Sequence, residues 1–198
     1  MPPYLIWMKK QGTGAITAID WSQSLTIEKK FTGGDLSTQQ YVADTFGWKM
    51  DSNGTDIVAA ARGWDGTPVP ANADRGSIYF FDEATKTEYQ QITRQGELGS
   101  YFGETVKFNG TDQVFASVPN EGTGGRTQGM VIEFNKVGGV WVEGQTIESS
   151  STYGGAQFGG SITMHGGYLV VGAPGDYTTI DSQGSVYIFE DQGGTWTE

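Results

Sequence analysis

Few side chains in this 198-residue sequence are suited to catalysis or to metal binding. The chain has no cysteine, which excludes disulfides and thiolate metal sites, and His165 is its single histidine. A zinc site would lack a second imidazole or a thiolate, and any Ser–His–Asp triad would have to be built on this one residue. His165 also precedes Gly166 at a predicted hairpin turn, which favours a structural role. We therefore expect no catalytic residue, no metal site and no cofactor.

The better candidates for chemistry are side chains that could contact a partner. Arg62, Trp64 and Asp65 follow one short apolar run, and Arg126 and Tyr177 follow two similar runs. Trp and Arg are favoured anchors in binding surfaces, and loops on a rigid scaffold often carry function. Trp64 has no counterpart after the other two runs. We expect these five residues to bind a ligand or partner, with Trp64 as a cap of its own loop as the alternative.

The charge of the chain narrows the class of partner. Asp and Glu number 23 against 12 Lys and Arg, which gives a net charge of −11, all of it within residues 46–198. Binding to nucleic acid needs clustered cations, so nucleic acid is not an expected partner. The sequence also has no run of 18 apolar residues, so we expect no membrane insertion.

An internal repeat indicates which elements must position these residues. A Phe-Gly pair occurs three times at a spacing of 56 residues, and the same features follow each pair. These are a Gly-containing turn, an apolar run of small residues, a variable loop, a Gly that opens a β-branched and aromatic run, and finally an aromatic residue. The three pairs are Phe46-Gly47, Phe102-Gly103 and Phe158-Gly159, and the aromatic residues are Tyr89, Trp141 and Trp196.

Each repeat reads as four antiparallel strands. The Asn-Gly pairs at 53 and 109 favour tight hairpin turns, and the Val, Ile, Tyr and Phe runs favour strands. Strands of small residues suit a place where several sheets converge on an axis. Four strands in about 50 residues, copied along a chain, predict an all-β fold, a β-propeller of four-stranded antiparallel blades.

The repeat divides the chain into units. Residues 46–101, 102–157 and 158–198 are expected to form blades, the last of them possibly incomplete, and residues 1–45 a partial blade or a docking arm. Trp21 to Glu28 parallels Trp141 to Glu148, which favours the partial blade. The total is about three and a half blades. We expect the chain to be part of a larger propeller, the alternatives being cover by another molecule or a compact four-bladed ring.

Phe-Gly followed about fifteen residues later by Gly172-Ala173-Pro174 resembles the FG-GAP repeat. That family builds the propeller heads of integrin α-subunits and occurs in many bacterial and viral surface proteins. The resemblance covers residues 46–198 and extends faintly to residue 4. Two units replace Gly-Ala-Pro by Ala59-Ala60-Ala61 and Ser117-Val118-Pro119, which keep side chains small and preserve the expected fold.

The resemblance raises the question of calcium, because the first hairpin of the integrin type often holds this ion. The nearest match here comprises Asp51, Asn53 and Asp56. Calcium prefers six to eight oxygen ligands, and this short loop offers two carboxylates and one amide. We expect the metal-free type of repeat, with a hairpin turn that carries an exposed acidic rim.

The resemblance and the variable loops together predict a non-catalytic binding or structural module. Its partners would be other protein subunits or surface glycans, with homo-oligomers or a larger assembly as further possibilities. The first ten residues lack the pattern of a secretory signal peptide. We expect a virion component such as a phage tail or fibre protein, or an extracellular adhesion protein that reaches the surface by assembly or within a longer parent chain. The alternative is a propeller-fold glycan hydrolase or lyase, with Glu104 and Asp65 as the acids to test.

Overall fold

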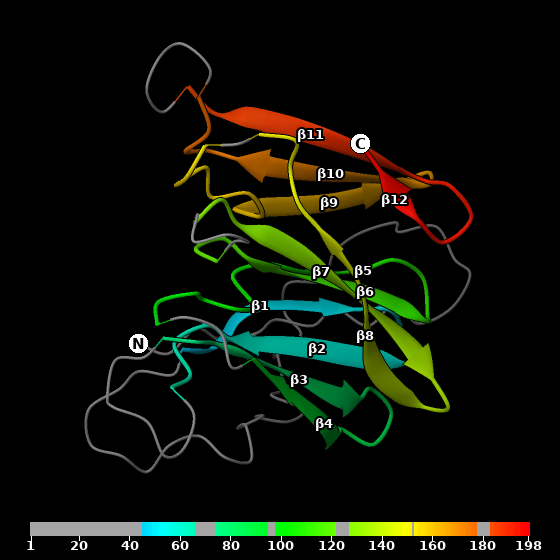
Figure 1. Ribbon diagram of the computed structural model, residues 1–198. Helices are drawn as coiled ribbons and strands as arrows, with labels where there is room; N and C mark the ends of the chain where they lie inside the picture. The colour runs from blue at the N-terminus through cyan, green and yellow to red at the C-terminus, as the bar shows by residue number, and fades with distance from the viewer. Residues whose placement is uncertain (1–44, 66–73, 95–97, 122–126, 152, 178–182) are drawn as a thin grey trace, which may run out of the picture. The chain divides into compact units, whose positions relative to one another are not determined.

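The computed structural model describes residues 45–65, 74–94, 98–121, 127–151, 153–177 and 183–198, all within one compact unit, Thr32–Glu198. Within these residues every regular element is a β-strand (Figure 1). The described residues therefore contain no helix long and apolar enough to cross a membrane. Apart from Thr45, the predicted N-terminal unit 1–45 lies outside the described residues.

The described strands form three antiparallel sheets of four, and in each sheet the strands are ordered as in the sequence. This is the all-β architecture of propeller blades that the repeat predicted. The first sheet comprises β1 (Phe46–Ser52), β2 (Asp56–Ala61), β3 (Ser77–Asp82) and β4 (Thr87–Thr93). The second comprises β5 (Val106–Phe108), β6 (Gln113–Val118), β7 (Met130–Val137) and β8 (Val140–Ile147). The third comprises β9 (Ser161–His165), β10 (Tyr168–Ala173), β11 (Ser185–Asp191) and β12 (Trp196–Thr197).

The first hairpin turns differ from the expected pattern. Asn53 does not have a positive φ, and its side-chain Oδ1 instead accepts hydrogen bonds from the backbone N–H groups of Thr55 and Asp56 at 3.0 and 2.8 Å. His165 is the last residue of β9 and pairs with Tyr168, so the turn lies one residue later than predicted. Gly166 and Gly167 form it, with φ of 57° and 83°. Two consecutive positive φ angles define the hairpin turn that suits twisted strands, and glycine reaches them without steric cost.

Consecutive sheets pack face to face through apolar side chains. One core cluster joins Val58, Ile78 and Phe80 of the first sheet to Phe102 and Trp141 of the second unit. A second cluster joins Phe115 and Val131 of the second sheet to Phe158, Leu169 and Val171 of the third unit. Fully burying one such side chain contributes about 1.5–3 kcal/mol, so these two clusters are the main source of cohesion between sheets.

The Phe-Gly pairs attach each sheet to the preceding one. The backbone N–H of Phe102 donates to the carbonyl of Arg75 at 2.9 Å, and that of Phe158 donates to the carbonyl of Gln128 at 2.8 Å. A Cβ built on Gly103 would lie 2.9 Å from the Cβ of Ala60, and one on Gly159 would lie 2.6 Å from the Cβ of Ser117. Only glycine allows so close an approach, which is why the motif needs this residue after the phenylalanine.

Trp141, near the start of β8, and Trp196, which opens β12, make a second attachment through glutamine side chains, and the sequence did not predict these glutamine contacts. Gln90 of the first sheet accepts a hydrogen bond from the backbone N–H of Trp141 and donates one to its carbonyl, both at 2.7 Å. Gln145 of the second sheet does the same to Trp196, at 2.8 and 3.0 Å. One glutamine amide thus satisfies both backbone groups of a residue in the next sheet.

Candidate interaction surface

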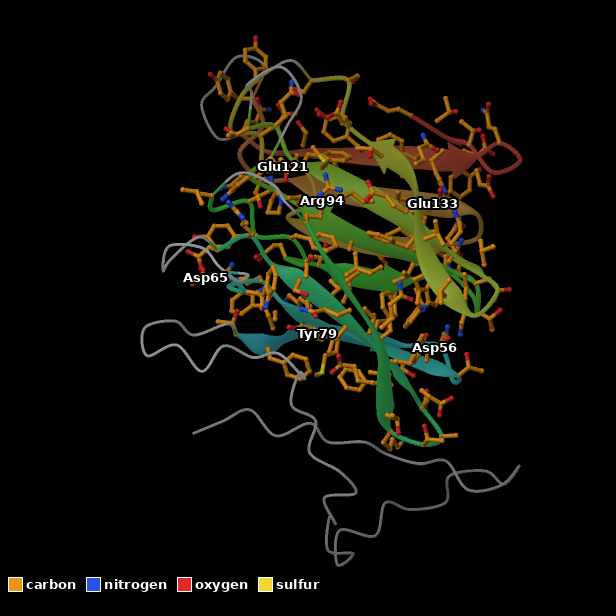
Figure 2. All side chains as sticks on the ribbon, turned by 60° about the horizontal axis from the view of Figure 1, so that its bottom comes forward. Asp56, Asp65, Tyr79, Arg94, Glu121 and Glu133 are labelled. Carbon is orange, nitrogen blue, oxygen red and sulfur yellow. The ribbon has the colours of Figure 1, made fainter. Side chains whose placement is uncertain are left out.

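Four of the five predicted binding residues, Arg62, Trp64, Asp65 and Tyr177, lie where the second strand of a sheet connects to the third. Asp56 begins β2 and Asp65 follows its end, so the two lie at opposite ends of that strand (Figure 2). Loop residues at the Asp65 end differ between the three sheets, whereas the strands that carry them are alike. This combination of rigid frame and variable loop is typical of binding surfaces.

The three connections are closed by the same backbone hydrogen bond. The N–H of Gly76 donates to the carbonyl of Trp64 at 2.9 Å, that of Gly129 to Glu121 at 2.8 Å, and that of Gly184 to Asp176 at 2.7 Å. Trp64, Glu121 and Asp176 are therefore structurally equivalent. The backbone is fixed at this point while the side chain changes its chemistry completely.

Trp64 and Asp65 are both largely covered. Trp64 is only 8% exposed, and Asp65 is 6% exposed and accepts a hydrogen bond from the backbone N–H of Asp74 at 2.8 Å. Burial and the nearby charge of Asp65 raise the pKa of Asp74. Trp64 is thus buried in this structure, and both its contact with a partner and its alternative role as a loop cap stay predictions.

Arg62 belongs to a cluster between the first two sheets. Its Nη1 lies 2.6 Å from Glu104 Oε2, and its guanidinium carbon lies 3.8 Å from the centre of the Trp48 ring and 5.0 Å from that of Tyr101. The guanidinium therefore stacks on an indole while its charge is paired. Trp48 remains 41% exposed.

Trp48 is the most exposed of three aromatic residues of this surface that the sequence did not predict, the others being Tyr101 and Tyr153. It follows Phe46-Gly47 directly, at the position held by Glu104 in the second unit and by Gly160 in the third. The available signal was that no other unit has an aromatic residue there. Trp48 lies within β1, and a tryptophan in a strand is an ordinary packing residue.

Tyr177 belongs to a different cluster, at the third sheet. Its ring centre lies 4.6 Å from that of Tyr153, and its backbone N–H donates to Asp176 Oδ1 at 2.9 Å. Asp176 is buried and also accepts hydrogen bonds from Ser151 Oγ at 2.8 Å and from the Tyr187 hydroxyl. Arg126 lies outside the described residues.

The residues of the calcium-like loop each contact protein groups. Asp51 Oδ2 lies 3.0 Å from Lys107 Nζ and accepts a hydrogen bond from the N–H of Phe108 at 2.8 Å. Asp56 Oδ2 lies 2.6 Å from Lys136 Nζ, and Asp56 Oδ1 accepts a hydrogen bond from Tyr89 at 2.7 Å. Among the described residues, no group of three or more carboxylate, imidazole or thiol side chains is arranged to hold a metal ion.

Comparison with known proteins agrees with the repeat analysis. The FG-GAP repeat family model matches residues 141–189, which run from β8 to β11 and include Phe158-Gly159 and Gly172-Ala173-Pro174. No curated protein matches the sequence. The match covers one sheet-to-sheet junction, and the other described junction has the same hydrogen bonds and close glycine contacts. The chain thus carries the FG-GAP repeat, the blade unit of β-propeller binding and structural modules.

Proposed function

We propose that this chain is a non-catalytic binding module that uses the loop end of its sheets to hold protein subunits or surface glycans. The observation that carries the proposal is the exposed Trp48 ring beneath the Arg62 guanidinium. An indole offers a flat apolar face, and the paired arginine offers N–H donors at its edge. Such a combination suits the hydroxyl-rich face of a sugar or a polar segment of a protein.

Several features support a non-catalytic role over the glycan hydrolase or lyase. Glu104 is ion-paired with Arg62 at 2.6 Å, and Asp65 is buried and hydrogen-bonded to the Asp74 backbone. Glycoside hydrolysis needs two carboxylates that flank one bond, with one of them free to donate a proton. Neither acid is arranged for that task. We therefore expect no turnover of polysaccharides, and Glu104→Gln should leave any trace activity of a preparation unchanged.

We further propose that the module acts on a virion or at an extracellular surface, as a tail, fibre or adhesion component. The absence of cysteine, the net charge of −11 and the resemblance to surface proteins support this assignment. Mass spectrometry of purified particles and of surface-protein fractions from the source tests it. Recovery of the chain only from the soluble interior of cells would contradict it.

The binding surface is tested with a glycan array and with the purified structural proteins of the source particle as probes. Trp48→Ala should reduce binding at least about tenfold, since it removes an anchor of the size that dominates interfaces. Tyr168→Ala is the matched control, because Tyr168 is a similarly exposed aromatic residue on the last sheet. Equal binding by both variants and the parent chain would show that the loop end near Trp48 is not the site.

A further inference from the structure

One face of the third sheet is exposed, whereas the equivalent face of each of the first two sheets is buried. Register places Ile78, Val131 and Val186 at equivalent positions, and likewise Phe80, Glu133 and Ile188. In the first two sheets these residues are buried beneath the following sheet. In the third sheet Val186 is 69% exposed and Ile188 is 56% exposed.

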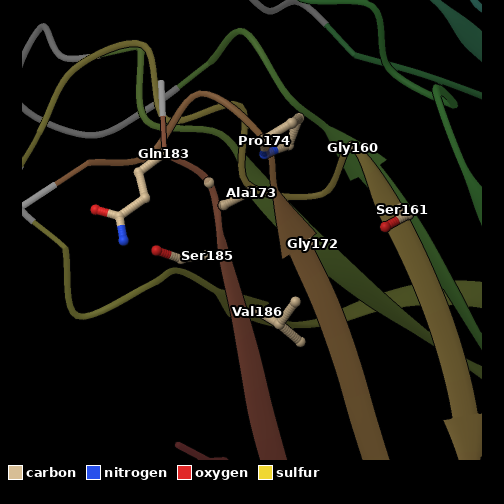
Figure 3. Close-up of a pocket in the computed structure, with 9 residues that line it drawn as sticks. Gly160, Ser161, Gly172, Ala173, Pro174, Gln183, Ser185 and Val186 are labelled. Atoms are coloured by element: carbon tan, nitrogen blue, oxygen red, sulfur yellow. The ribbon is translucent and has the colours of Figure 1, made fainter. Parts of the chain in front are cut away.

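This exposed face contains a groove of about 430 Å³ where β9, β10 and β11 come together (Figure 3). Small residues form much of its lining, among them Gly160, Gly172 and Gly184. Pro174 and Val186 add apolar surface. The groove therefore combines this small and apolar lining with three polar residues, Ser161, Gln183 and Ser185.

In the earlier sheets the same positions hold the next Phe-Gly pair. Gly103 approaches Ala60 and Ile78, and Gly159 approaches Ser117 and Val131. Ala60 and Ser117 correspond by register to Gly172, and Ile78 and Val131 correspond to Val186. The groove of Figure 3 is thus equivalent to two sites on the earlier sheets, each of which is the receptor for a Phe-Gly pair.

The glycine just before the third strand of each sheet also distinguishes the first two sheets from the third. A Cβ built on Gly76 would lie 2.0 Å from the carbonyl oxygen of Phe102, and one on Gly129 would lie 2.2 Å from that of Phe158. For a Cβ on Gly184, the equivalent residue, the nearest atom of the described residues would be the oxygen of Pro174, at 3.5 Å. Gly184 keeps a positive φ of 77° although no Phe-Gly pair of the described residues is docked on it.

We propose that the groove between β10 and β11 is the receptor for the Phe-Gly pair of a further FG-GAP blade, supplied from outside these 198 residues. The phenylalanine would lie over Gly184, and its glycine would pack on Gly172 and Val186. Ile188 would be covered by the aromatic residue near the start of that blade's outer strand, as Phe80 is covered by Trp141 at a ring distance of 5.0 Å. The interface would continue the two sheet junctions already described.

A second copy of the chain is a poorer occupant. Its Phe102 and Phe158 are fully buried in their own receptors. The face of its first sheet that points away from the second sheet is also covered, because Ala59, Tyr79 and Phe81 are buried. The ring of its Phe46 packs against Tyr79, with the ring centres 5.3 Å apart. The buried face of the first sheet disfavours a second copy. Its Phe46-Gly47 pair, where a Cβ built on Gly47 would meet no atom of the described residues within 4 Å, is the alternative occupant that sedimentation tests.

The chain can be extended by a further blade, which serves as a probe. Trp196 corresponds to Trp141, so residues 142–198 are appended directly after Trp196. Hydrogen exchange should then slow at least about tenfold for the amides of residues 184–188. Changing Phe158 to Ala in the appended copy only is the matched control, and it should remove most of this protection.

A pair of glycine variants gives an independent readout. Gly184→Ala should be mild in the parent chain and should become as damaging as Gly129→Ala in the extended chain, because only there would a phenylalanine lie against the new methyl group. Two results together would support the proposal. The slowed hydrogen exchange should be lost when the appended Phe158 is changed to Ala, and the cost of Gly184→Ala should rise in the extended chain. A folded extension that leaves exchange and the Gly184→Ala cost unchanged would overturn it.

Two further measurements keep the test decisive. If the extended chain does not fold by circular dichroism, a synthetic peptide of residues 153–165 is titrated into the parent chain. NMR shifts at Gly172, Gly184 and Val186 that vanish with a Phe158→Ala peptide would support the proposal, and none at millimolar peptide would refute it. Sedimentation of the parent chain as a dimer that Val186→Arg dissociates would also refute it, since the occupant would then be a second copy. Val142→Arg is the control for an exposed valine outside the groove.

Discussion

Trp141 and Trp196 occupy the same position in consecutive sheets but use their indole N–H differently. Trp141 Nε1 donates to the Tyr89 hydroxyl at 2.8 Å, whereas Trp196 Nε1 donates to Glu133 Oε1 at 3.3 Å. Their backbone groups, in contrast, are held alike, by Gln90 and Gln145. The invariant part of the junction is thus the glutamine amide, and the side-chain acceptor can change between sheets.

The glutamine contact predicts a measurable loss of stability. Gln90→Ala removes two hydrogen bonds and leaves the N–H and carbonyl of Trp141 without these partners. At about 0.5–1.5 kcal/mol for each hydrogen bond, the free energy of unfolding should fall by about 1–3 kcal/mol in urea denaturation. Gln192→Ala, at an exposed glutamine, should change it by less than about 0.5 kcal/mol. Equal effects of the two substitutions would mean that the amide does not hold the junction.

Asp176 predicts a dependence of stability on pH. Its burial raises the pKa, but hydrogen bonds from Tyr187, Ser151 and Ser185 outweigh burial and hold the pKa below the ordinary value of 3.8. A carboxyl whose folded-state pKa is lowered contributes stability above its unfolded pKa, and this contribution is lost as the pH falls through the folded pKa. The parent chain should therefore lose stability below about pH 4 more steeply than Asp176→Asn does.

Thermal unfolding between pH 7 and pH 2 measures this difference. The exposed Asp112→Asn serves as the control for removing one carboxylate and should follow the parent curve. If Asp176→Asn also follows the parent curve through the acid range, the hydrogen bonds to Asp176 do not stabilise the folded state.

Individual strands are joined across sheets by a buried ion pair. Asp56, at the start of β2, is largely buried and lies 2.6 Å from Lys136 of β7. Breaking a buried pair costs more than the pair itself contributes, because the remaining charge stays away from water. Lys136 is partly exposed, which reduces this cost.

We expect Lys136→Met to lower the free energy of unfolding by about 1–3 kcal/mol. Asp56→Asn combined with Lys136→Met should recover part of the loss, since no unpaired carboxylate remains. A double-mutant cycle in urea measures the coupling between the two residues. Additive losses would show that the ion pair is not what links β2 to β7.

The strands themselves were predictable, because their patterns are local. The Val, Ile, Tyr and Phe runs form β3, β7 and β11, and the small-residue runs form β2, β6 and β10. The turn at Gly166-Gly167 was misplaced by one residue, because His165-Gly166 and Gly166-Gly167 satisfy the same composition rule and only strand register decides between them. The burial of Trp64 could not be predicted, because it depends on contacts with residues distant in the sequence.

The same contrast between local and non-local information holds for the candidate surface. Arg62 was identified from its sequence neighbours, and the structure places it in a cluster. Trp48 was missed because its contact with Arg62 joins β1 to the connection after β2. The glutamine contacts were missed for the same reason, since Gln90 and Trp141 are 51 residues apart in the sequence.

At the scale of the molecule, the period of 56 residues was the most informative feature of the sequence. It predicted equivalent sheets in sequential order, and the three described sheets have this order. The exposed face of β10 and β11 was not predictable in residue detail, because the period does not say which side of a strand faces the next sheet. That assignment came from the register, which pairs Gly172 with Val186 and Val170 with Ile188.

Docking of each Phe-Gly pair on the preceding sheet can be tested with two variants of the 198-residue chain. Gly129 and Gly184 are equivalent, and both have a positive φ, of 92° and 77°, so alanine suffers similar backbone strain at each. That strain should cost about 1 kcal/mol at Gly184. At Gly129 the added methyl group would also displace Phe158. This displacement should lower the free energy of unfolding by about 1–3 kcal/mol more. A much larger fall in the free energy of unfolding for Gly129→Ala than for Gly184→Ala is the predicted result, and equal falls would contradict the stacking of these sheets through their Phe-Gly pairs.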